Sequence, residues 1–431
     1  MEVRPGYKQT EVGVIPEDWA VSTIGDQSLI FGRIGFRGYT VDDIVDEGDG
    51  AIAINPSNIS DGKAVFEKCT YVSWHKYEES PEIKIDEGDV ILVKTGSTVG
   101  KTAMVKKLPG KATLNPQVVV FKKLRACPAF FAYMVGFPVI QQQITEAVVG
   151  GAVPTLSQRL VAEFKLPLPP LREQRAIAEA LSDVDGLLGG LDRLIAKKRD
   201  LKQAAMQQLL TGQTRLPGFS REWELKRLGD HVAFLRNGVN SRAELLPEGP
   251  VKYLHYGDVH ACKDVFIAPN ELPSLPDAKA ASLDRLRDGD LIFADASEDV
   301  AGISKSVEIK DVGNTEVVSG LHTIAARFDK KVLADGFKGF LQCCAPFATH
   351  LRRLAAGTKV FATNRGHVAS AEIRLPTVAE QTAIAEVLSD MDAEIAALEQ
   401  RRDKTRALKQ AMMQELLTGR TRLVKPEAVD A

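Results

Sequence analysis

The sequence predicts an α+β protein in which two related α/β domains are joined by two long helices that form an antiparallel coiled coil. An internal repeat is the first observation behind this prediction, because residues 173–216 align without a gap with residues 380–423 and 26 of the 44 pairs are identical. Apolar residues in both copies follow a helical spacing, which is the second observation. The third is that the regions between the copies hold short apolar runs bounded by glycine turns, as β-strands do.

The two α/β regions are related more weakly than the helices. Residues 18–26 resemble residues 222–230, which pairs Trp19 with Trp223, and residues 87–93 parallel 288–294 as a glycine turn followed by an apolar strand. Thr10 corresponds to Thr214, and Thr214 to Thr421, so the end of the chain leads back to its beginning. We therefore expect a circular pseudo-twofold arrangement with the termini close together.

Each repeated segment is predicted to form one long helix. The apolar residues recur at spacings of four and three, which defines a narrow packing seam; they are Ile177, Leu181, Val184, Leu188 and Leu191 in the first copy and Ile384, Leu388, Met391, Ile395 and Leu398 in the second. A helix over residues 172–210 would be about 58 Å long, and the glycine of each Leu-Leu-Thr-Gly motif, at 212 and 419, is a candidate C-cap. A twofold axis perpendicular to the helices makes them antiparallel. The alternative is that each helix packs only on its own domain.

Composition limits the function classes. The 431 residues are enough for two or three domains, and 55 basic against 57 acidic side chains give a net charge of -2, so any nucleic-acid surface has to be local. The five cysteines are scattered without a Cys-x-x-Cys pair, which argues against a disulfide framework or a zinc site and favours a reducing cytoplasm. The first residues do not resemble a signal peptide, and the longest apolar stretch, 128–140, is predicted to be a buried helix because it is too short to span a membrane.

Two local runs of basic residues could form a nucleic-acid surface although the net charge of the chain is slightly negative. Residues 94–125 contain eight lysines and arginines and no acid, and residues 336–371 contain five and again no acid. Lysine and arginine displace counterions from phosphates, so one run in each copy suits two contacts with DNA. The alternative interpretation is an ordinary solvated surface.

Several motifs suggest other chemistry but match poorly. The segment 95–102, Thr-Gly-Ser-Thr-Val-Gly-Lys-Thr, nearly forms a phosphate-binding loop, although Thr95 stands where glycine or alanine is needed and a β-turn is the alternative. His255, Asp258, His260 and Cys262 fit no standard metal site. No nucleophile with a base and an orienting group is evident, so we predict a binding protein with no catalytic residue and no metal.

The motifs together resemble a known family. The opening YKQTEVGVIPEDW, the segments LPPLREQRAIAEALSDVD, LKQAAMQQLLTGQTRLPGFSREWELKRLGD and SGLHTIAARF, and the second EQ-to-LLTG block resemble the specificity subunit of type I restriction-modification enzymes over essentially the whole chain. In the second copy Thr377-Val378 replaces Pro170-Leu171, and Arg374 stands where the first copy has Pro167.

The resemblance implies a DNA sequence-specificity subunit without catalytic activity. It implies target-recognition domain 1 at 1–168, helical spacer 1 at 169–212, target-recognition domain 2 at 213–374, helical spacer 2 at 375–424 and a C-terminal tail at 425–431. Each target domain would read one half of a bipartite, asymmetric sequence in double-stranded DNA. The implied partners are two modification subunits with S-adenosylmethionine and adenine-N6 methyltransferase activity, and restriction subunits that use ATP and Mg; this chain itself would hold no cofactor and work in the cytoplasm.

Candidate site residues follow from the basic runs and the repeat. For DNA binding we select Lys94, Lys101, Lys106, Lys107 and Lys111 in the first domain and Arg352, Arg353, Lys359, Asn364 and Arg365 in the second. For partner or interdomain contacts we select Glu173, Gln174, Leu181, Asp183, Leu209 and Leu210 with their repeat equivalents Glu380, Gln381, Leu388, Asp390, Leu416 and Leu417. The leucines could instead only fill the helix seam. A nucleotide-dependent enzyme, a structural coiled-coil adaptor and a modification system without restriction remain as alternatives.

Overall fold

The computed structural model describes residues 4–33, 37–148 and 154–424. The chain forms two compact units: unit 1 contains Met1–Leu191 and Arg401–Ala431, and unit 2 contains Asp192–Gln400. Each unit therefore combines one α/β domain with the first part of one long helix and the second part of the other. We call the α/β domains of units 1 and 2 domain 1 and domain 2. The predicted tail at 425–431 lies outside the described residues.

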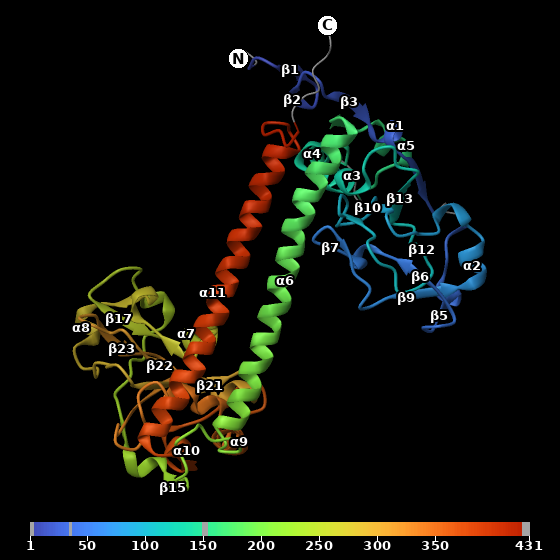
Figure 1. Ribbon diagram of the computed structural model, residues 1–431. Helices are drawn as coiled ribbons and strands as arrows, with labels where there is room; N and C mark the ends of the chain where they lie inside the picture. The colour runs from blue at the N-terminus through green and yellow to red at the C-terminus, as the bar shows by residue number, and fades with distance from the viewer. Residues whose placement is uncertain (1–3, 34–36, 149–153, 425–431) are drawn as a thin grey trace. The chain divides into compact units, whose positions relative to one another are not determined.

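Domain 1 is built on two sheets. Its strands are β1 (Tyr7–Thr10), β2 (Gly13–Pro16), β3 (Ala20–Thr23), β4 (Leu29–Gly32), β5 (Ile44–Val45), β6 (Gly50–Ile54), β7 (Ile59–Ser60), β8 (Lys63–Ala64), β9 (Thr70–Ser73), β10 (Val90–Val93), β11 (Thr102–Met104), β12 (Ala112–Leu114), β13 (Val118–Lys122) and β14 (Lys165–Leu168). The larger sheet has the order β4-β13-β10-β11-β8-β7 and the smaller one β12-β6-β9-β5, while β1 pairs β2 and β14 pairs β3 (Figure 1). All four residues of β10 are buried, as expected for an apolar run in a central strand.

Short helices cover these sheets. They are α1 (Ile24–Gln27), α2 (Trp74–Glu78), α3 (Pro128–Val135), α4 (Pro138–Ala147) and α5 (Gln158–Glu163). The single buried helix predicted over 128–140 is therefore wrong: α3 ends at Val135, and Pro138 begins a second helix. Proline fits the first turn of a helix but interrupts a helix interior, which explains the break.

Domain 2 repeats this plan. Its strands are β15 (Glu224–Arg227), β16 (Val232–Phe234), β17 (Val251–Leu254), β18 (Phe266–Ile267), β19 (Ser274–Leu275), β20 (Leu291–Ala294), β21 (Ala296–Ser297), β22 (Ser306–Ile309), β23 (Glu316–Ser319), β24 (Thr323–Phe328), β25 (Phe361–Ala362) and β26 (Glu372–Leu375). Its short helices are α7 (Tyr256–Ala261), α8 (Asp277–Ala280), α9 (Ala345–Leu354) and α10 (Arg365–Ala369).

The strand orders of the two domains match although their sequences differ. The sheet β16-β24-β20-β22-β18 corresponds to β4-β13-β10-β11-β8, and β23-β17-β19 corresponds to β12-β6-β9. The directions agree as well, because β12 runs parallel to β6 as β23 does to β17, and β11 runs parallel to β8 as β22 does to β18. The turn-and-strand segments 87–93 and 288–294, predicted to be equivalent, become the central strands β10 and β20 with a left-handed glycine before each, Gly88 and Gly289.

Two long helices complete the units. Helix α6 spans Leu171–Leu209 and α11 spans Val378–Leu416, so the helix expected over 172–210 is confirmed to within one residue. In unit 2, Lys198 of α6 pairs with Glu394 of α11 at 2.7 Å, and Lys202 pairs with Asp392 further along. Residue numbers thus rise along one helix as they fall along the other, which is the predicted antiparallel packing. Gly212 and Gly419 have φ angles of 72° and 69°, so the predicted glycine caps are confirmed.

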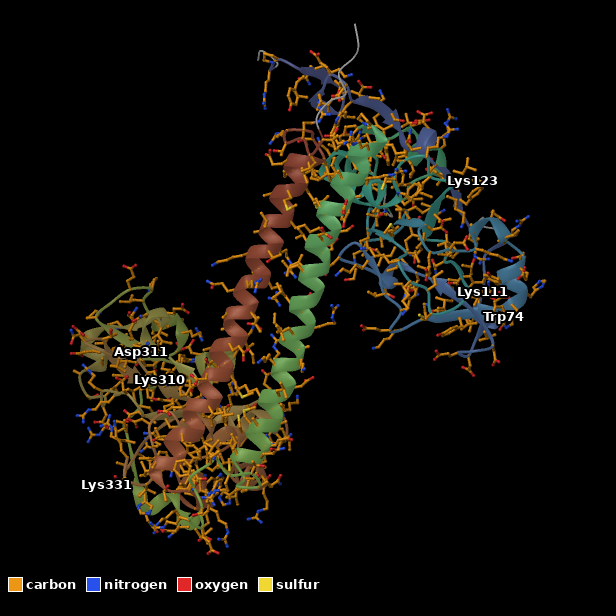
Figure 2. All side chains as sticks on the ribbon, viewed as in Figure 1. Trp74, Lys111, Lys123, Lys310, Asp311 and Lys331 are labelled. Atoms are coloured by element: carbon orange, nitrogen blue, oxygen red, sulfur yellow. The ribbon has the colours of Figure 1, made fainter. Side chains whose placement is uncertain are left out.

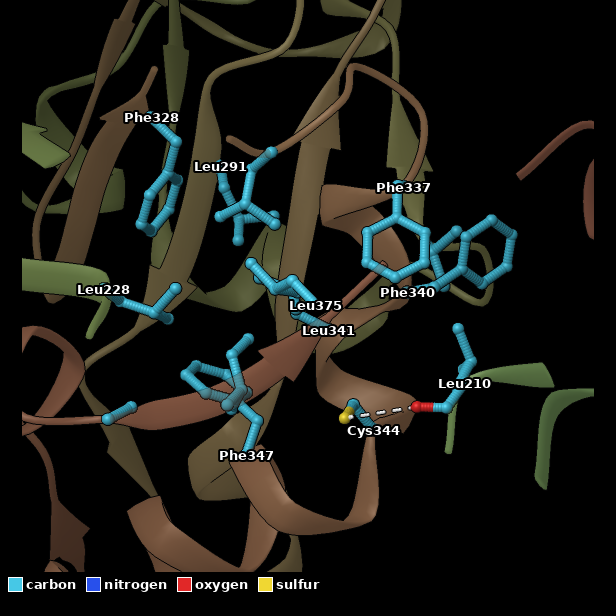
Figure 3. Packing of buried hydrophobic residues seen from close by; sticks show 14 of the residues in the cluster. Leu210, Leu228, Leu291, Phe328, Phe337, Phe340, Leu341, Cys344, Phe347 and Leu375 are labelled. Carbon is cyan, nitrogen blue, oxygen red and sulfur yellow. Dashed lines mark hydrogen bonds between the residues drawn. The ribbon is translucent and has the colours of Figure 1, made fainter. Parts of the chain in front are cut away.

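The helices pack into the cores of their own units. In unit 1 the core contains Ile177 and Leu181 of α6 with Leu416 at the end of α11 and Leu417 beyond it. In unit 2 it contains Ile384 and Leu388 of α11, Leu209 and the following Leu210 with domain 2 phenylalanines such as Phe337, Phe340 and Phe347. Figure 3 shows this second core, in which the thiol of Cys344 donates to the carbonyl oxygen of Leu210 at 3.7 Å. Both predicted packing modes, helix on helix and helix on domain, therefore occur together.

No helix within the described part of the chain is long and apolar enough to cross a membrane. All five cysteines lie in that part and are free thiols.

Candidate nucleic-acid interface and helix anchors

A buried carboxylate anchors the start of α6 in unit 1. Glu173 is 2% exposed, accepts from the indole nitrogen of Trp19 at 3.0 Å, and pairs with Arg422 at 2.6 Å. The guanidinium of Arg422 also pairs with Asp18 at 2.8 Å, and hydrogen bonds to Glu173 and Asp18 raise the pKa of Arg422. The hydroxyl of Tyr7 donates to the carbonyl oxygen of Gly419 at 2.8 Å. Residues near the two ends of the chain therefore meet in unit 1 (Figure 1), as the circular repeat predicts.

Unit 2 contains the equivalent anchor at the start of α11. Glu380 is 1% exposed and pairs with Arg215 at 2.5 Å, and a hydrogen bond to Glu380 raises the pKa of Arg215. The carbonyl oxygen of Arg221 accepts from the same guanidinium. Arg215 and Arg422 are absent from the residues selected by sequence, although both are identical in the repeat alignment.

The neighbouring glutamines fasten each helix to its domain through backbone groups. The Gln174 side chain accepts from the backbone nitrogen of Cys127 and donates to the carbonyl oxygen of Pro169, both at 2.8 Å. The Gln381 side chain accepts from Ala334 N at 2.9 Å and donates to Pro376 O at 3.0 Å. The repeated Glu-Gln pair thus holds helix and domain together inside each unit.

Most of the residues selected for partner or interdomain contact are buried inside a unit. These are Glu173, Gln174, Leu181, Leu209, Leu210, Glu380, Gln381, Leu388, Leu416 and Leu417. Only Asp183 and Asp390 of this set are exposed. They are therefore the members of the set that a separate partner chain could contact without rearrangement of a core.

A second repeated contact joins the middle of each helix pair to its domain. In unit 1 the hydroxyl of Tyr133 donates to Asp185 at 2.6 Å, Lys409 pairs with the same carboxylate at 2.7 Å, and the ammonium lies 5.2 Å from the centre of the Tyr133 ring. Burial, with the hydrogen bond to Asp185, raises the pKa of Tyr133. These side chains line a cavity of about 220 Å³ that also includes Lys106.

Unit 2 keeps this contact without the hydroxyl. Lys202 pairs with Asp392, and its ammonium lies 5.9 Å from the centre of the Phe340 ring. Phenylalanine cannot donate, and the buried Oδ2 of Asp392 has no hydrogen-bond partner among the described residues. Tyr133, Lys202 and Lys409 were missed at the level of sequence; the identity of the two lysines and the two aspartates in the repeat was the available signal.

The DNA-binding candidates of domain 1 occupy two ends of one hairpin. Lys94 follows β10 and Lys101 precedes β11, while Lys106 and Lys107 lie past the other end of β11. Lys111 precedes β12 and is labelled in Figure 2. Lys101, Lys106, Lys107 and Lys111 are exposed, Lys94 is partly buried, and none of the five forms an ion pair with a described residue. They are thus available to phosphates but are not gathered at one point.

Other basic residues of that run are not available in the same way. Lys122 pairs with Asp89 at 2.6 Å and with Asp86 at 3.0 Å, so acids from another segment neutralise it. Lys123 is exposed at the opposite end of β13 from the hairpin turn that follows β12 (Figure 2).

The candidates of domain 2 fall into two groups. Arg352 and Arg353 are exposed in the last turn of α9, and Lys359 is exposed in the loop before β25. The side chain of Asn364 caps α10 by accepting from His367 N at 2.9 Å. Arg365 donates to the carbonyl oxygen of Leu235 at 2.7 Å and to Asn237 at 3.1 Å. Asn364 and Arg365 therefore already have structural partners, whereas the other three candidates form no ion pair with a described residue.

The segment that resembles a phosphate-binding loop has a different structure. Residues 96–100 form a turn with left-handed glycines at 96 and 100, and the chain continues into strand β11. A phosphate-binding loop leads into a helix whose N-terminal amides face the phosphates. The alternative of a β-turn is thus confirmed.

The residues imagined as metal ligands are separately engaged. Asp258 pairs with Arg242 at 2.6 Å, the His260 ring bonds to the carbonyl oxygen of Ala296 at 2.9 Å, and the thiol of Cys262 donates to the carbonyl oxygen of Asp264. Within the described ranges, no group of three or more His, Cys, Asp or Glu side chains is arranged to hold a metal ion.

Comparison with known proteins agrees with this architecture. Residues 16–194 match the family model described as a type I restriction modification DNA specificity domain. Over 95% of this chain and 94% of the relative, the sequence is 25% identical to the type I restriction enzyme MjaVIII specificity subunit of Methanocaldococcus jannaschii. The putative MjaX specificity subunit of the same organism is 24% identical over 97% of each chain.

A solved structure shows the same fold. The S subunit of a type I restriction-modification system from M. genitalium superimposes with a TM-score of 0.57 at 13% identity, covering 96% of this chain and 98% of that chain. These findings agree with one another: residues 16–194 match a type I restriction modification DNA specificity domain, the chain is similar in sequence to type I specificity subunits over nearly its whole length, and it shares the fold of a solved S subunit.

Proposed function

We propose that domain 1 and domain 2 each read one half of a bipartite, asymmetric sequence in double-stranded DNA. The observation that carries this proposal is that the two domains share strand order and direction but present different side chains on that frame. Two copies of one frame suit two contacts of the same kind, and different side chains suit different bases. The long helices would set the separation of the half-sites, about one turn of DNA or 10 bp centre to centre.

In this proposal the chain is the non-catalytic subunit of a cytoplasmic complex. Two modification subunits would methylate adenine N6 with S-adenosylmethionine, and restriction subunits would use ATP and Mg. Methylation alone, without restriction subunits, would use the same specificity surfaces. The free thiols fit a reducing compartment.

A methylation map tests the proposal directly. We would express the modification subunit with and without this chain and map N6-methyladenine at base resolution. One asymmetric bipartite motif that depends on this chain is the expected result. Active modification subunit that assembles with the chain but methylates no such motif would contradict the proposal and favour a structural adaptor.

A salt titration tests the lysines of domain 1. Replacing Lys101, Lys106, Lys107 and Lys111 with glutamine should weaken binding to all DNA sequences and lower the slope of log affinity against log salt by about 0.9 for each phosphate that is no longer neutralised. Replacing the exposed Lys331 of domain 2 is the control and should leave the slope unchanged. An unchanged slope in the fourfold variant would exclude these lysines from the interface.

Charge reversal tests the docking of modification subunits. Asp183 and Asp390 are exposed, occupy equivalent positions on α6 and α11, and are identical in the repeat, which suits two copies of one partner. The double variant Asp183→Lys, Asp390→Lys should lose co-purification with the modification subunit while keeping its helical content. Asp200→Lys, at an exposed position of α6 without an acidic equivalent, is the matched control. Unchanged co-purification of the double variant would move the docking surface elsewhere.

A further inference from the structure

One edge of each domain places exposed or partly buried polar side chains on the same pattern of backbone hydrogen bonds. In domain 1 the backbone nitrogen of Lys94, just after β10, donates to the carbonyl oxygen of Gln117 at 2.8 Å. In domain 2 the backbone nitrogen of Asp295, just after β20, donates to the carbonyl oxygen of His322 at 3.1 Å. Strand pairing gives the same equivalence, because Val93 faces Val118 as Ala294 faces Thr323.

Neighbouring contacts extend this equivalence. Asn115 N donates to the carbonyl oxygen of Ile54 at 2.9 Å, as Gly320 N donates to that of Leu254 at 2.8 Å. The next crossing of the chain also matches, since Leu156 N bonds to Lys94 O and Thr363 N to Asp295 O, both at 2.8 Å. The turns between β12 and β13 and between β23 and β24 are therefore the same structural feature. We call them the edge turns.

The backbone hydrogen bonds of the two edge turns are the same, but their side chains differ, and at one position the charge is opposite. Lys94 and Gln117 in domain 1 become Asp295 and His322 in domain 2, so a cation is replaced by an anion at one position. Gln117 is exposed, and neither its amide nor the Lys94 ammonium has a hydrogen-bond partner among the described residues. His322 is 53% exposed and lies 3.1 Å from Asp295 through Nδ1.

The edge of domain 2 is organised around the His322 ring. The ring centre lies 5.6 Å from that of Tyr256 in an edge-to-face arrangement, and the φ of His322, 56°, is a left-handed backbone conformation that is uncommon for residues other than glycine. Asp295 orients the ring by accepting from Nδ1, which makes Nε2 of the neutral ring an acceptor. No described residue bonds to Nε2. The ring therefore presents a fixed, unused hydrogen-bonding atom.

At each edge turn, a side chain that follows a neighbouring strand also donates a hydrogen bond to a backbone carbonyl oxygen. In domain 1, Arg33 follows β4, is 3% exposed, and donates to the carbonyl oxygen of Leu114 at 2.9 Å. In domain 2, Asn237 follows β16 and donates to the carbonyl oxygen of Gly320 at 3.3 Å. Arg365, a DNA-binding candidate, bonds to the same Asn237. Positions that are held rigidly and still offer free polar atoms suit the readout of base edges, which needs fixed donors and acceptors.

We propose that the two edge turns are the base-reading points of the two domains, with Lys94 and Gln117 reading one half-site and His322, oriented by Asp295, reading the other. This inference rests on the proposed function and names residues for it. Glutamine and lysine match purine edges, adenine N6 and N7 for the amide and guanine O6 and N7 for the ammonium. An acceptor at His322 Nε2 matches the exocyclic amino group of cytosine or adenine. Arg33 and Asn237 are positioning residues.

Two single substitutions in the complete methyltransferase complex test this proposal. Gln117→Ala is expected to relax base preference in one half-site only, and His322→Asn in the other half-site only. Asparagine tolerates left-handed backbone, so the second variant preserves the turn. We expect roughly 5- to 150-fold lower preference at one or two base positions, with the spacer and the untouched half-site unchanged, in a base-resolution adenine-methylation map.

Matched controls lie at the opposite end of each sheet, where Lys123 follows β13 and Asp311 lies two residues after β22. Lys123 and Asp311 are exposed non-glycine residues with φ of 51° and 58°, and Figure 2 labels both. Lys123→Ala and Asp311→Ala should leave every base preference intact.

The outcomes separate this inference from the proposed function. If the wild-type complex methylates a bipartite motif but both edge-turn variants keep all base preferences, the edge turns do not read bases and the function stands. Uniformly weaker methylation with unchanged preferences would make these side chains phosphate contacts and would also overturn the inference. If the wild-type complex methylates no bipartite motif, the proposed function itself fails.

Discussion

The two units hold their long helices with equivalent carboxylates, but the hydrogen bonds around those carboxylates differ. In unit 1 Glu173 bonds to Trp19 and Arg422, and Asp185 bonds to Tyr133 and Lys409. In unit 2 the corresponding Glu380 and Asp392 keep their cations. The indole nitrogen of Trp223 and Oδ2 of Asp392, however, are buried without a partner among the described residues.

Chain connectivity gives a physical reason for part of this difference. Arg422 and Asp18, which meet in unit 1, are 404 positions apart, so side-chain contacts must hold the two ends of the chain together. In unit 2, Arg215 and Trp223 belong to one short segment, and the covalent backbone itself keeps them close. Closing a long loop costs more chain entropy than closing a short one. The comparison indicates that the network at the chain ends replaces a covalent connection.

The largest loss of stability, and the clearest difference between the units, is expected when the two anchoring carboxylates are removed one at a time. Glu173→Ala leaves the Trp19 indole nitrogen without its acceptor and Arg422 with Asp18 alone, and should lower the free energy of unfolding by about 3 kcal/mol. Glu380→Ala strands only Arg215 and should cost about 2 kcal/mol. Urea denaturation followed by tryptophan fluorescence measures both. Glu179→Ala, at an exposed position of α6, should change little, and equal losses at 173 and 380 would refute the role of the chain ends.

Replacing each helix-capping glycine with alanine should also destabilise unit 1 more than unit 2. A Cβ at Gly419 would lie 2.5 Å from Cγ of Pro16, whereas a Cβ at Gly212 would lie 3.2 Å from the Trp223 ring. Both alanines also have to adopt a left-handed φ, which costs about 1–2 kcal/mol. We expect Gly419→Ala to be the more destabilising in thermal unfolding. Gly190→Ala, in an open helical position, should be neutral or stabilising by up to about 1 kcal/mol, and a larger loss there would undermine the comparison.

Alkaline pH should affect unit 1 through Tyr133. Burial and Asp185 raise the pKa of this phenol above its ordinary value of 10.0, so it stays protonated in the folded chain after the unfolded chain has ionised. Its contribution to stability is full below pH 10 and falls as the pH rises above it, by up to about 1.4 kcal/mol per pH unit. Tyr133→Phe should therefore unfold with a shallower pH dependence than the wild type between pH 9 and 11, in urea titrations at each pH. Parallel curves would show that Tyr133 ionises equally in both states.

The smallest change in stability is expected when the contact in unit 2 is given the tyrosine hydroxyl that it lacks. Phe340→Tyr supplies the hydroxyl that unit 1 has, and its donation to Asp392 Oδ2 should stabilise the chain by about 1 kcal/mol. Differential scanning calorimetry would detect the gain as a higher melting temperature. Phe347→Tyr, in the same core but at a position without this equivalence, should be destabilising. A loss of stability in Phe340→Tyr would mean that the core of unit 2 has no room for the hydroxyl.

Much of the architecture could be predicted from the sequence because its signals are local and repeated. The seam residues from Ile177 to Leu191, the glycines at 212 and 419, and the strands after Gly88 and Gly289 depend on spacings of a few residues. The division of 128–140 into two helices was missed because the apolar composition hid the effect of Pro138 on the backbone. The same composition that favours a buried helix is compatible with two.

The candidate site was predicted less well. The repeat identified Glu173, Gln174 and their equivalents as constrained, but identity alone cannot separate a partner surface from an anchor inside the unit. Their burial and hydrogen bonds, across 154 positions in the case of Trp19 and Glu173, assign them to the anchors. The basic runs located available lysines, but Lys122 in the same run is neutralised by Asp86 and Asp89.

The sequence alone determined the duplication, the two long helices, their ends and the return of the chain to its beginning. These follow from periodicity and from alignment of the chain with itself, which require no knowledge of distant contacts. The equivalence of the edge turns could come only from the folded chain, because strand pairing aligns Lys94 with Asp295 and Gln117 with His322 where the side chains share no identity. Backbone hydrogen bonds preserve a frame independently of side chains, so a frame can persist after its sequence has diverged.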